Sequence, residues 1–417
     1  MNSDVVSQKK RVWSNFRAMG LVQASNYLLP LVFLPYLARV VGVDNFGLIA
    51  LSLSLTLYFS ALVEYGFDYS AVRVVAQIQG DIVQLRKLFY EVLACKVFLL
   101  GVSFAIYVLV ISTFSAFAEY KEYLLASFLI VPLKMLMHEW YLQGIEKMRH
   151  LSMLHFITKL IYAISIFIFV KDEKDILLVP LLNALAFLVS VSFANYLIYK
   201  QQIYSKFFIP SLAETYARLK SGWNIFLTQL APNFYNSFSI VLLGVVAPLG
   251  VVGQLDAARK LTTIFEQFAT LLSRAFYPFL ARNISFHKWY LFVVTSAAIL
   301  VLIIVSFAAE VIILLLFGEA YVIAAKYVPA LGFAMVFAVV YQAFATNFLL
   351  LVGRDSIVRN ITLGASVLGF VMALYLVPRY EAWGVIGVLL ITRFLMAAFS
   401  LLSSARVYRH VTFQKKD

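Results

Sequence analysis

Long apolar segments, separated by short polar ones, follow one another along the whole chain. Each is about 20 residues long, the length at which an α-helix crosses a bilayer, and this favours helices over a membrane β-barrel with its alternating pattern. The pattern predicts an all-α integral membrane protein with twelve transmembrane helices. The expected helices cover residues 18–41, 46–66, 88–112, 123–143, 151–170, 176–199, 223–247, 251–281, 289–317, 326–351, 357–378 and 382–405.

The two longest polar connections are expected near residues 67–87 and 200–222. The second divides the helices six and six. We therefore predict an N-terminal six-helix lobe over residues 1–199, a cytoplasmic linker over 200–222, and a C-terminal six-helix lobe over 223–417.

The two halves resemble each other. A shift of 206 positions places Gln23 on Gln229 and Gly47 on Gly253. Copies of six helices point the same way through the membrane, so the lobes should be related by a pseudo-twofold axis along the membrane normal. Such a pair of lobes is expected to enclose a central polar cavity and to transport by alternating access.

The composition agrees with this class, since 63% of the residues are hydrophobic and only 13% are charged. Lys and Arg concentrate in every second connection, and the positive-inside rule then places both termini in the cytoplasm. The net charge of +13 therefore reflects topology and attraction to anionic lipid, and we do not interpret it as nucleic-acid binding. The single cysteine, Cys95, excludes an intramolecular disulfide, and no metal site is expected.

Charged side chains lie inside several of the expected helices. A charge near the bilayer centre costs about 2.5 to 3.5 kcal/mol on insertion scales, so these side chains should face a wet or protein-filled interior. An amphipathic helix on the membrane surface is the alternative for residues 254–274. The cations expected to line the cavity are Lys134, Lys159, Arg259, Lys260, Arg274 and Arg393.

Three of these cations, Lys134, Lys159 and Arg393, have no acid three or four residues away. Each therefore has either an acidic partner on another helix or an anionic ligand, for which a diphosphate is the best match. Lys96, with Glu91 nearby in sequence, is a candidate for a structural ion pair. Groups that could couple transport to H⁺ or Na⁺ are Asp256, Glu266, Glu139 and His138.

Enzyme motifs are missing from the sequence: it has no nucleotide-binding Gly-rich loop, no HExxH metal motif and no GxSxG nucleophile elbow. No cofactor is expected beyond a coupling ion. A membrane glycosyltransferase or polymerase would need a large outer catalytic loop. We therefore predict a transporter.

The segments PYLARVVG, DNFG and EYGF near the start, YLQGIEKMR in the fourth helix and VGQLDAARKL in the eighth carry a family resemblance. The chain resembles bacterial O-antigen flippases of the polysaccharide branch of the multidrug/oligosaccharidyl-lipid/polysaccharide exporter superfamily. The resemblance implies translocation of an undecaprenyl-diphosphate-linked oligosaccharide across the bacterial inner membrane, with membrane lipids and other proteins of polysaccharide assembly as partners. A multidrug antiporter of the same fold is the main alternative, although it would favour an acidic cavity.

For such a substrate, we expect Lys134, Lys159, Arg274 and Arg393 to neutralise the diphosphate on the cytoplasmic side. Arg259, Lys260 and Arg39 would receive the headgroup on the outer side. Polar side chains of the first and seventh helices would donate hydrogen bonds to sugar hydroxyls. These are Gln23, Asn26, Gln229 and Asn233.

Overall fold

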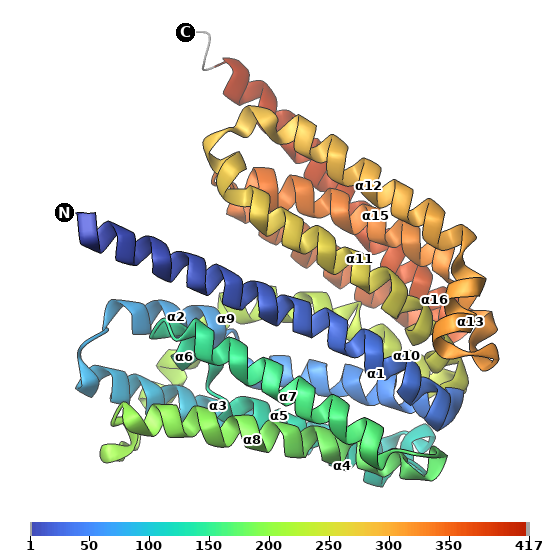
Figure 1. The fold of residues 1–417 in the computed structure, drawn as a ribbon, viewed down its shortest axis with the longest axis horizontal. Helices are drawn as coiled ribbons and strands as arrows, with labels where there is room; N and C mark the ends of the chain where they lie inside the picture. The colour runs from blue at the N-terminus through green and yellow to red at the C-terminus, as the bar shows by residue number, and fades with distance from the viewer. Residues whose placement is uncertain (1, 414–417) are drawn as a thin grey trace. The chain divides into compact units, whose positions relative to one another are not determined.

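The computed structural model describes the backbone of residues 2–413 and the side chains of residues 29–408 apart from residue 31. Within these limits the regular structure is entirely helical (Figure 1). Two compact units form: the first contains residues 1–41 and 55–230, and the second contains residues 42–54 and 231–417. Residues 42–54 therefore pack with the second unit although they lie early in the sequence.

The first unit contains most of α1 and the helices as far as α9. Their bounds are α1 Asn2–Glu64, α2 Phe67–Gln77, α3 Ile82–Thr113, α4 Lys121–Phe128, α5 Ile130–Leu136, α6 Glu139–Gly144, α7 Met148–Phe169, α8 Leu178–Lys200 and α9 Leu212–Leu230. Helix α1 covers the first two expected helices. It bends at Gly42, whose φ of 78° lies in the left-handed region that glycine tolerates.

The fourth expected helix is broken into α4, α5 and α6. Pro132 offers no N–H to the carbonyl of Phe128, and the helix is interrupted at Leu129. A second break falls at His138, whose φ is 48°. The expected connection at residues 67–87 also differs, because most of it is the helix α2.

The expected linker, residues 200–222, is partly helical as well, since α9 begins at Leu212. Ser211 and Glu214 form a reciprocal capping box: the Ser211 N–H donates to Glu214 Oε2 over 2.9 Å, and the Glu214 N–H donates to Ser211 Oγ over 3.2 Å. Lys87 of α3 contacts Glu214 at 2.7 Å. The hydrogen bonds from Lys87 and Ser211 lower the pKa of Glu214 to about 2.

The second unit consists of residues 42–54 of α1 and the helices from α10 onward. Their bounds are α10 Ser237–Val246, α11 Leu249–Arg282, α12 His287–Phe307, α13 Ala309–Phe317, α14 Val322–Ala325, α15 Val328–Phe344 and α16 Asp355–Phe413. The 3₁₀ turn Ala231–Phe234, at Pro232, separates α9 from α10 and so breaks the seventh expected helix. Helices α11, α12, α15 and α16 lie side by side (Figure 1).

Seven helical stretches of the described residues have the length and apolar composition to cross a membrane. They are Val32–Gln77, Ile82–Thr113, Met148–Phe169, Glu173–Lys200, Ile284–Phe307, Val328–Leu349 and Asp355–Tyr408. The last contains two of the expected helices and bends at Glu381, whose φ is 47°. The first contains the expected helix 46–66 and the end of the expected helix 18–41. Twelve spans and a twofold relation between lobes stay predictions.

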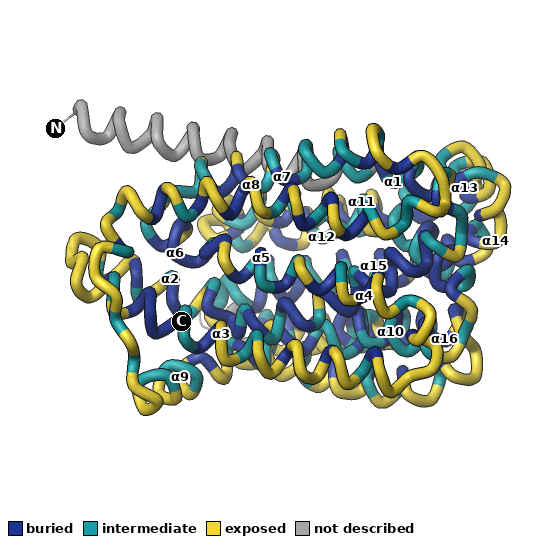
Figure 2. Tube along the Cα trace, turned by 90° about the horizontal axis from the view of Figure 1, so that it is seen from below, coloured by how far each residue is buried: buried dark blue, intermediate teal, exposed yellow. Residues whose placement is uncertain are grey.

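Apolar side chains cover the outward helix faces. Exposed positions run along helices such as α3 and α16 (Figure 2), and on α3 they include Phe98 and Leu109, which are 58% and 65% exposed. Large apolar side chains on an outer surface fit contact with lipid tails rather than water. Together with the seven spanning stretches, they identify a multi-pass membrane protein.

Candidate functional site

An ion pair between α16 and α11 lies inside the second unit. Both terminal nitrogens of the Arg393 guanidinium donate to Glu266: Nη1 to Oε1, and Nη2 to Oε2 over 3.1 Å. This two-pronged geometry is the strongest form of an arginine–carboxylate pair. Of the two options left open for Arg393, an acidic partner on another helix or an anionic ligand, the structure has the first.

A cavity of about 220 Å³ with both polar and apolar lining lies next to this ion pair. Glu266 and Thr270 of α11 form one wall, and the other comes from α15 and the residues after it. The remaining lining residues are Ala338, Val339, Tyr341, Gln342 and Thr346. Hydroxyl, amide and carboxylate groups therefore form part of the wall of a space that is large enough for several water molecules of about 30 Å³ each.

Hydrogen bonds hold the cavity wall in place. Gln342 Nε2 donates to Thr270 Oγ1 over 3.3 Å, and Thr270 Oγ1 donates to the Glu266 carbonyl over 2.9 Å. The Tyr341 and Thr362 hydroxyls lie 2.7 Å apart. Because Gln342 belongs to α15 and Thr270 to α11, this hydrogen bond links the two walls of the cavity.

A π-helix, Ala345–Leu349, follows α15 directly, and its Thr346 lines the cavity. Its buried Asn347 accepts a hydrogen bond from Ser273 Oγ over 2.5 Å and donates one to the Ser273 carbonyl over 3.0 Å. Short π-helical turns are frequent at functional sites. Asn347 was not singled out from the sequence, where it is recognisable only as a polar residue within an apolar segment.

Several of the charged residues on α11 interact with one another. Asp256 and Lys260 pair at 3.3 Å, one turn apart, as their spacing suggests. Arg259 is half-buried and interacts electrostatically with Asp256. Arg274 is exposed and has no ion pair within 4 Å among the described residues.

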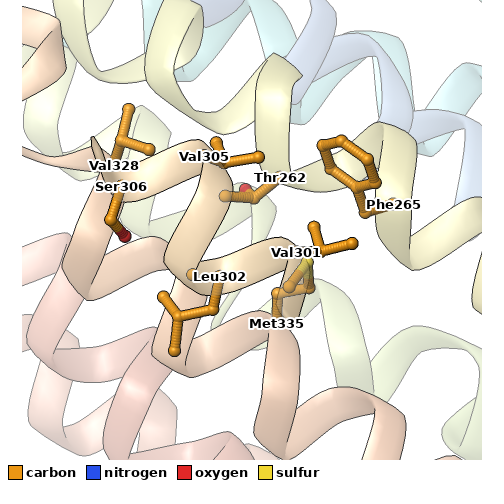
Figure 3. Close-up of a pocket in the computed structure, with 9 residues that line it drawn as sticks. Thr262, Phe265, Val301, Leu302, Val305, Ser306, Val328 and Met335 are labelled. Carbon is orange, nitrogen blue, oxygen red and sulfur yellow. The ribbon is translucent and has the colours of Figure 1, made fainter. Parts of the chain in front are cut away.

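A second pocket, which is mostly apolar, lies between α11, α12 and α15 (Figure 3). Phe265, Val301 and Met335 are among the side chains that line it, and Thr262 and Ser306 are its polar members. It has no room for a water molecule. We therefore assign it to helix packing and not to ligand binding.

The first unit holds a group of charges from several helices. Lys96 Nζ contacts Glu64 Oε2 at 2.5 Å, so its partner is Glu64 and not the sequence neighbour Glu91. Glu91 instead accepts two hydrogen bonds from Arg218 of α9. His155 Nε2 lies 3.3 Å from Glu139 Oε2.

Lys134 belongs to the same group. It interacts electrostatically with Glu139 and with Asp68, yet it has no ion pair within 4 Å in the described part of the chain. Asp68 lies just beyond the second expected helix and was not singled out from the sequence. A basic side chain without a close carboxylate is the kind of group that can bind an anion.

The other predicted site residues have varied surroundings. Lys159 is half-buried on α7 and Arg39 is exposed on α1. His138 is buried, with its ring centroid 4.7 Å from that of Phe89, so it packs against an aromatic side chain.

Two of the candidate sugar-binding residues lie close to the break between α9 and α10. Gln229 is exposed near the end of α9, and the half-buried Asn233 accepts a hydrogen bond from Ser237 over 3.3 Å. Gln23 and Asn26 lie outside the described side chains. The described residues contain no group of three side chains suited to holding a metal ion.

Comparison with known families and proteins gives a consistent result. A family model described as "Polysaccharide biosynthesis protein" matches residues 12–284. A protein of Shigella dysenteriae named "Putative O-antigen transporter" is 25% identical over 399 residues, which cover 93% of this chain and 98% of that protein. A protein of the same name from Escherichia coli K12 is 26% identical over 281 residues, or 67% of this chain and 66% of that protein.

Solved structures with the same fold include two kinds of transporter. A eukaryotic MATE transporter aligns with a TM-score of 0.58 and 16% identity over 95% of both chains. The lipid II flippase MurJ in an inward closed conformation aligns with a TM-score of 0.53 and 13% identity, over 96% of this chain and 86% of the other. At these identities the similarity concerns the fold alone.

Proposed function

Because the chain belongs to the polysaccharide biosynthesis protein family, we propose that it moves a lipid-linked oligosaccharide from the inner to the outer leaflet of the bacterial inner membrane. The observation that carries the proposal is the similarity to a named O-antigen transporter over 93% of this chain and 98% of the relative. A match that runs the full length of both proteins supports a shared transport task rather than a shared fragment. Both termini would lie in the cytoplasm.

The substrate we propose is an undecaprenyl-diphosphate-linked repeat unit of O-antigen or a related polysaccharide. Its diphosphate needs cations, and its sugars need hydroxyl and amide partners. In the first unit, Lys134 supplies a cation without a close carboxylate. In the second unit, the cavity beside Glu266 supplies Thr270 and Gln342.

Arg393 has a conditional role in this proposal. Glu266 accepts hydrogen bonds from Nη1 and Nη2, so a phosphate group binds either to the remaining N–H groups of the guanidinium or by displacing the carboxylate. The cavity of about 220 Å³ takes a single sugar ring more readily than a chain of sugars. The rest of the oligosaccharide and the lipid tail would then lie outside it, with the tail in the bilayer.

Alternating access would expose the headgroup first to the cytoplasmic side and then to the outer side. A membrane potential can drive this movement, since one charge crossing 100 mV is worth about 2.3 kcal/mol and the anion leaves a negative interior. Coupling to H⁺ or Na⁺ is the alternative drive. Transport measured with the potential collapsed but the pH gradient kept distinguishes the two.

The decisive test is reconstitution of the purified protein in liposomes that carry a fluorescent undecaprenyl-diphosphate oligosaccharide on one leaflet. We expect the protein to accelerate the appearance of the label on the opposite leaflet. Liposomes with a cationic dye in place of the glycolipid test the multidrug antiporter. Dye movement without glycolipid movement would refute the proposal in favour of that antiporter.

A further inference from the structure

Asp68 of α2 is a carboxylate whose surroundings are unusual. Its Oδ1 atom is buried and receives no hydrogen bond from any described residue. A buried carboxylate oxygen without a donor is strongly disfavoured when it is ionised, and an apolar membrane environment increases this effect. The ionised form of Asp68 therefore depends on positive charge in its surroundings.

The charges around Asp68 come from four other helices: Glu64 of α1, Lys96 of α3, Lys134 of α5 and Glu139 of α6. Lys96 is committed to Glu64, which it contacts at 2.5 Å. Glu139 has its own partner in His155 of α7.

The remaining charges nearby are engaged elsewhere or point outward. On α9, which packs against α2, Arg218 is held by Glu91. Arg73 of α2 itself is exposed. The buried His138 interacts electrostatically with Lys96. Lys134 is thus the remaining cation that can offset the negative charge of Asp68, and the two side chains lie more than 4 Å apart.

We propose that Asp68 is a proton-binding site and that the proton and an anionic headgroup bind to this unit cooperatively through Lys134. A proton from water adds to the carboxylate and gives a neutral carboxylic acid. The Lys134 ammonium then has one carboxylate less to attract it and is available to phosphate oxygens. The second half of the proposal rests on the function proposed above.

The same linkage holds in reverse. A diphosphate bound at Lys134 adds negative charge close to Asp68, which favours the protonated carboxyl. Thermodynamic reciprocity requires the two effects to be equal. For one linked proton, the affinity for the headgroup falls by up to about tenfold for each pH unit above the titration of Asp68.

Calorimetry on the full-length protein in lipid nanodiscs tests the linkage. The probe is a short-prenyl diphosphate sugar, whose diester phosphates do not titrate near neutral pH. Titrations in two buffers of different ionisation heat give the number of protons taken up on binding. We expect uptake in the wild-type protein, none in Asp68→Asn, and retained uptake in Asp68→Glu.

Asp81→Asn is the matched control, because Asp81 is an exposed cap residue of α3 in the same unit. It should leave proton uptake unchanged. Proton release on binding, or uptake that persists in Asp68→Asn, would overturn the cooperative binding.

Infrared spectroscopy tests the proton site without any ligand. The wild-type protein should show the C=O absorption of a protonated buried carboxyl, lost at high pH and lost in Asp68→Asn but not in Asp81→Asn. If the band is absent from the wild-type protein, or unchanged in Asp68→Asn, the proton site is refuted. If the band behaves as expected but no diphosphate sugar binds, the proton site is supported, whereas the headgroup assignment and the cooperativity are refuted.

Discussion

Gly47 of α1 and Gly253 of α11 face each other in the second unit at a distance that leaves no room for a side chain. A Cβ atom on Gly47 would lie 3.0 Å from the Gly253 nitrogen and 1.9 Å from the Leu249 carbonyl oxygen. A Cβ on Gly253 would lie 2.3 Å from the Val43 carbonyl oxygen. Residues 42–54 therefore pack backbone to backbone on α11. The two glycines that the internal repeat aligns are the two that meet here.

Replacing Gly47 by alanine should destabilise the second unit. The added methyl group would meet backbone atoms, which cannot rotate away, and overpacking of this kind costs about 1–3 kcal/mol. Thermal unfolding of the purified protein in detergent measures the loss. Gly101→Ala is the control, because a Cβ there has no atom within 4 Å and alanine favours the helix α3. Equal midpoints for the two variants would contradict this account of the contact.

Removing either partner of the Arg393–Glu266 pair should destabilise the protein. A fully buried pair loses about 3–5 kcal/mol when one partner is removed. Because these side chains are 17% and 20% exposed, we expect about 1–3 kcal/mol for Arg393→Gln or Glu266→Gln.

The double variant Arg393→Gln with Glu266→Gln separates the structural role of the pair from its role in transport. It removes both charges, so it should recover most of the lost stability. If Arg393 also binds phosphate, glycolipid transport in liposomes should still be lost. Full transport by the double variant would show that the pair is only structural.

Lys134→Gln should abolish glycolipid transport and leave the fold intact. The substitution removes a cation that has no ion pair within 4 Å among the described residues, so little stability depends on it. Surface polysaccharide in a complemented deletion strain and the thermal midpoint are the two measurements. Lys121→Gln, at the exposed start of α4, serves as the control. Normal polysaccharide from Lys134→Gln would remove this residue from the headgroup site.

Glu214→Gln should weaken the docking of α9 on α3 at neutral pH. The Lys87 and Ser211 hydrogen bonds lower the pKa of Glu214 from 4.5 to about 2. A depressed pKa means that the ionised carboxylate stabilises the folded state above about pH 4.5, and this stabilisation disappears as the pH falls towards 2.

Hydrogen exchange of the first turns of α9 measures this effect. The difference between Glu214→Gln and the wild-type protein should be largest at neutral pH and should shrink as the pH approaches 2. Glu119→Gln, at an exposed position outside α9, should show no such difference. A pH-independent difference would mean that the capping geometry, and not the charge, holds the helix.

Helix positions were predictable because the length of an apolar segment is a local property of the sequence. The bends at Gly42 and Glu381 fall in the short gaps between expected helices. The seven spanning stretches are fewer than the twelve expected helices for three reasons. Two neighbouring expected helices form one continuous stretch in α16, as they do in α1, and prolines break the fourth and seventh expected helices. The charged residues of α11 lower the hydropathy of the eighth.

The partners of the charged residues were not predictable in the same way. Arg393 and Glu266 are 127 positions apart, and only the packing of α16 on α11 brings them together. Lys96 is five residues after Glu91, which places the two on different helix faces, and it pairs instead with Glu64. Asp68 was missed because its segment was expected to be a connection and is instead the helix α2.

Division of the polypeptide at the expected linker would not yield two self-sufficient fragments. A fragment that begins at residue 223 would lack residues 42–54, which belong to its own compact unit. The surface around Gly253 would then be left without its close neighbour Gly47. Co-expressed halves should therefore complement each other only when residues 42–54 of the amino-terminal fragment pack into the unit formed by the carboxy-terminal fragment.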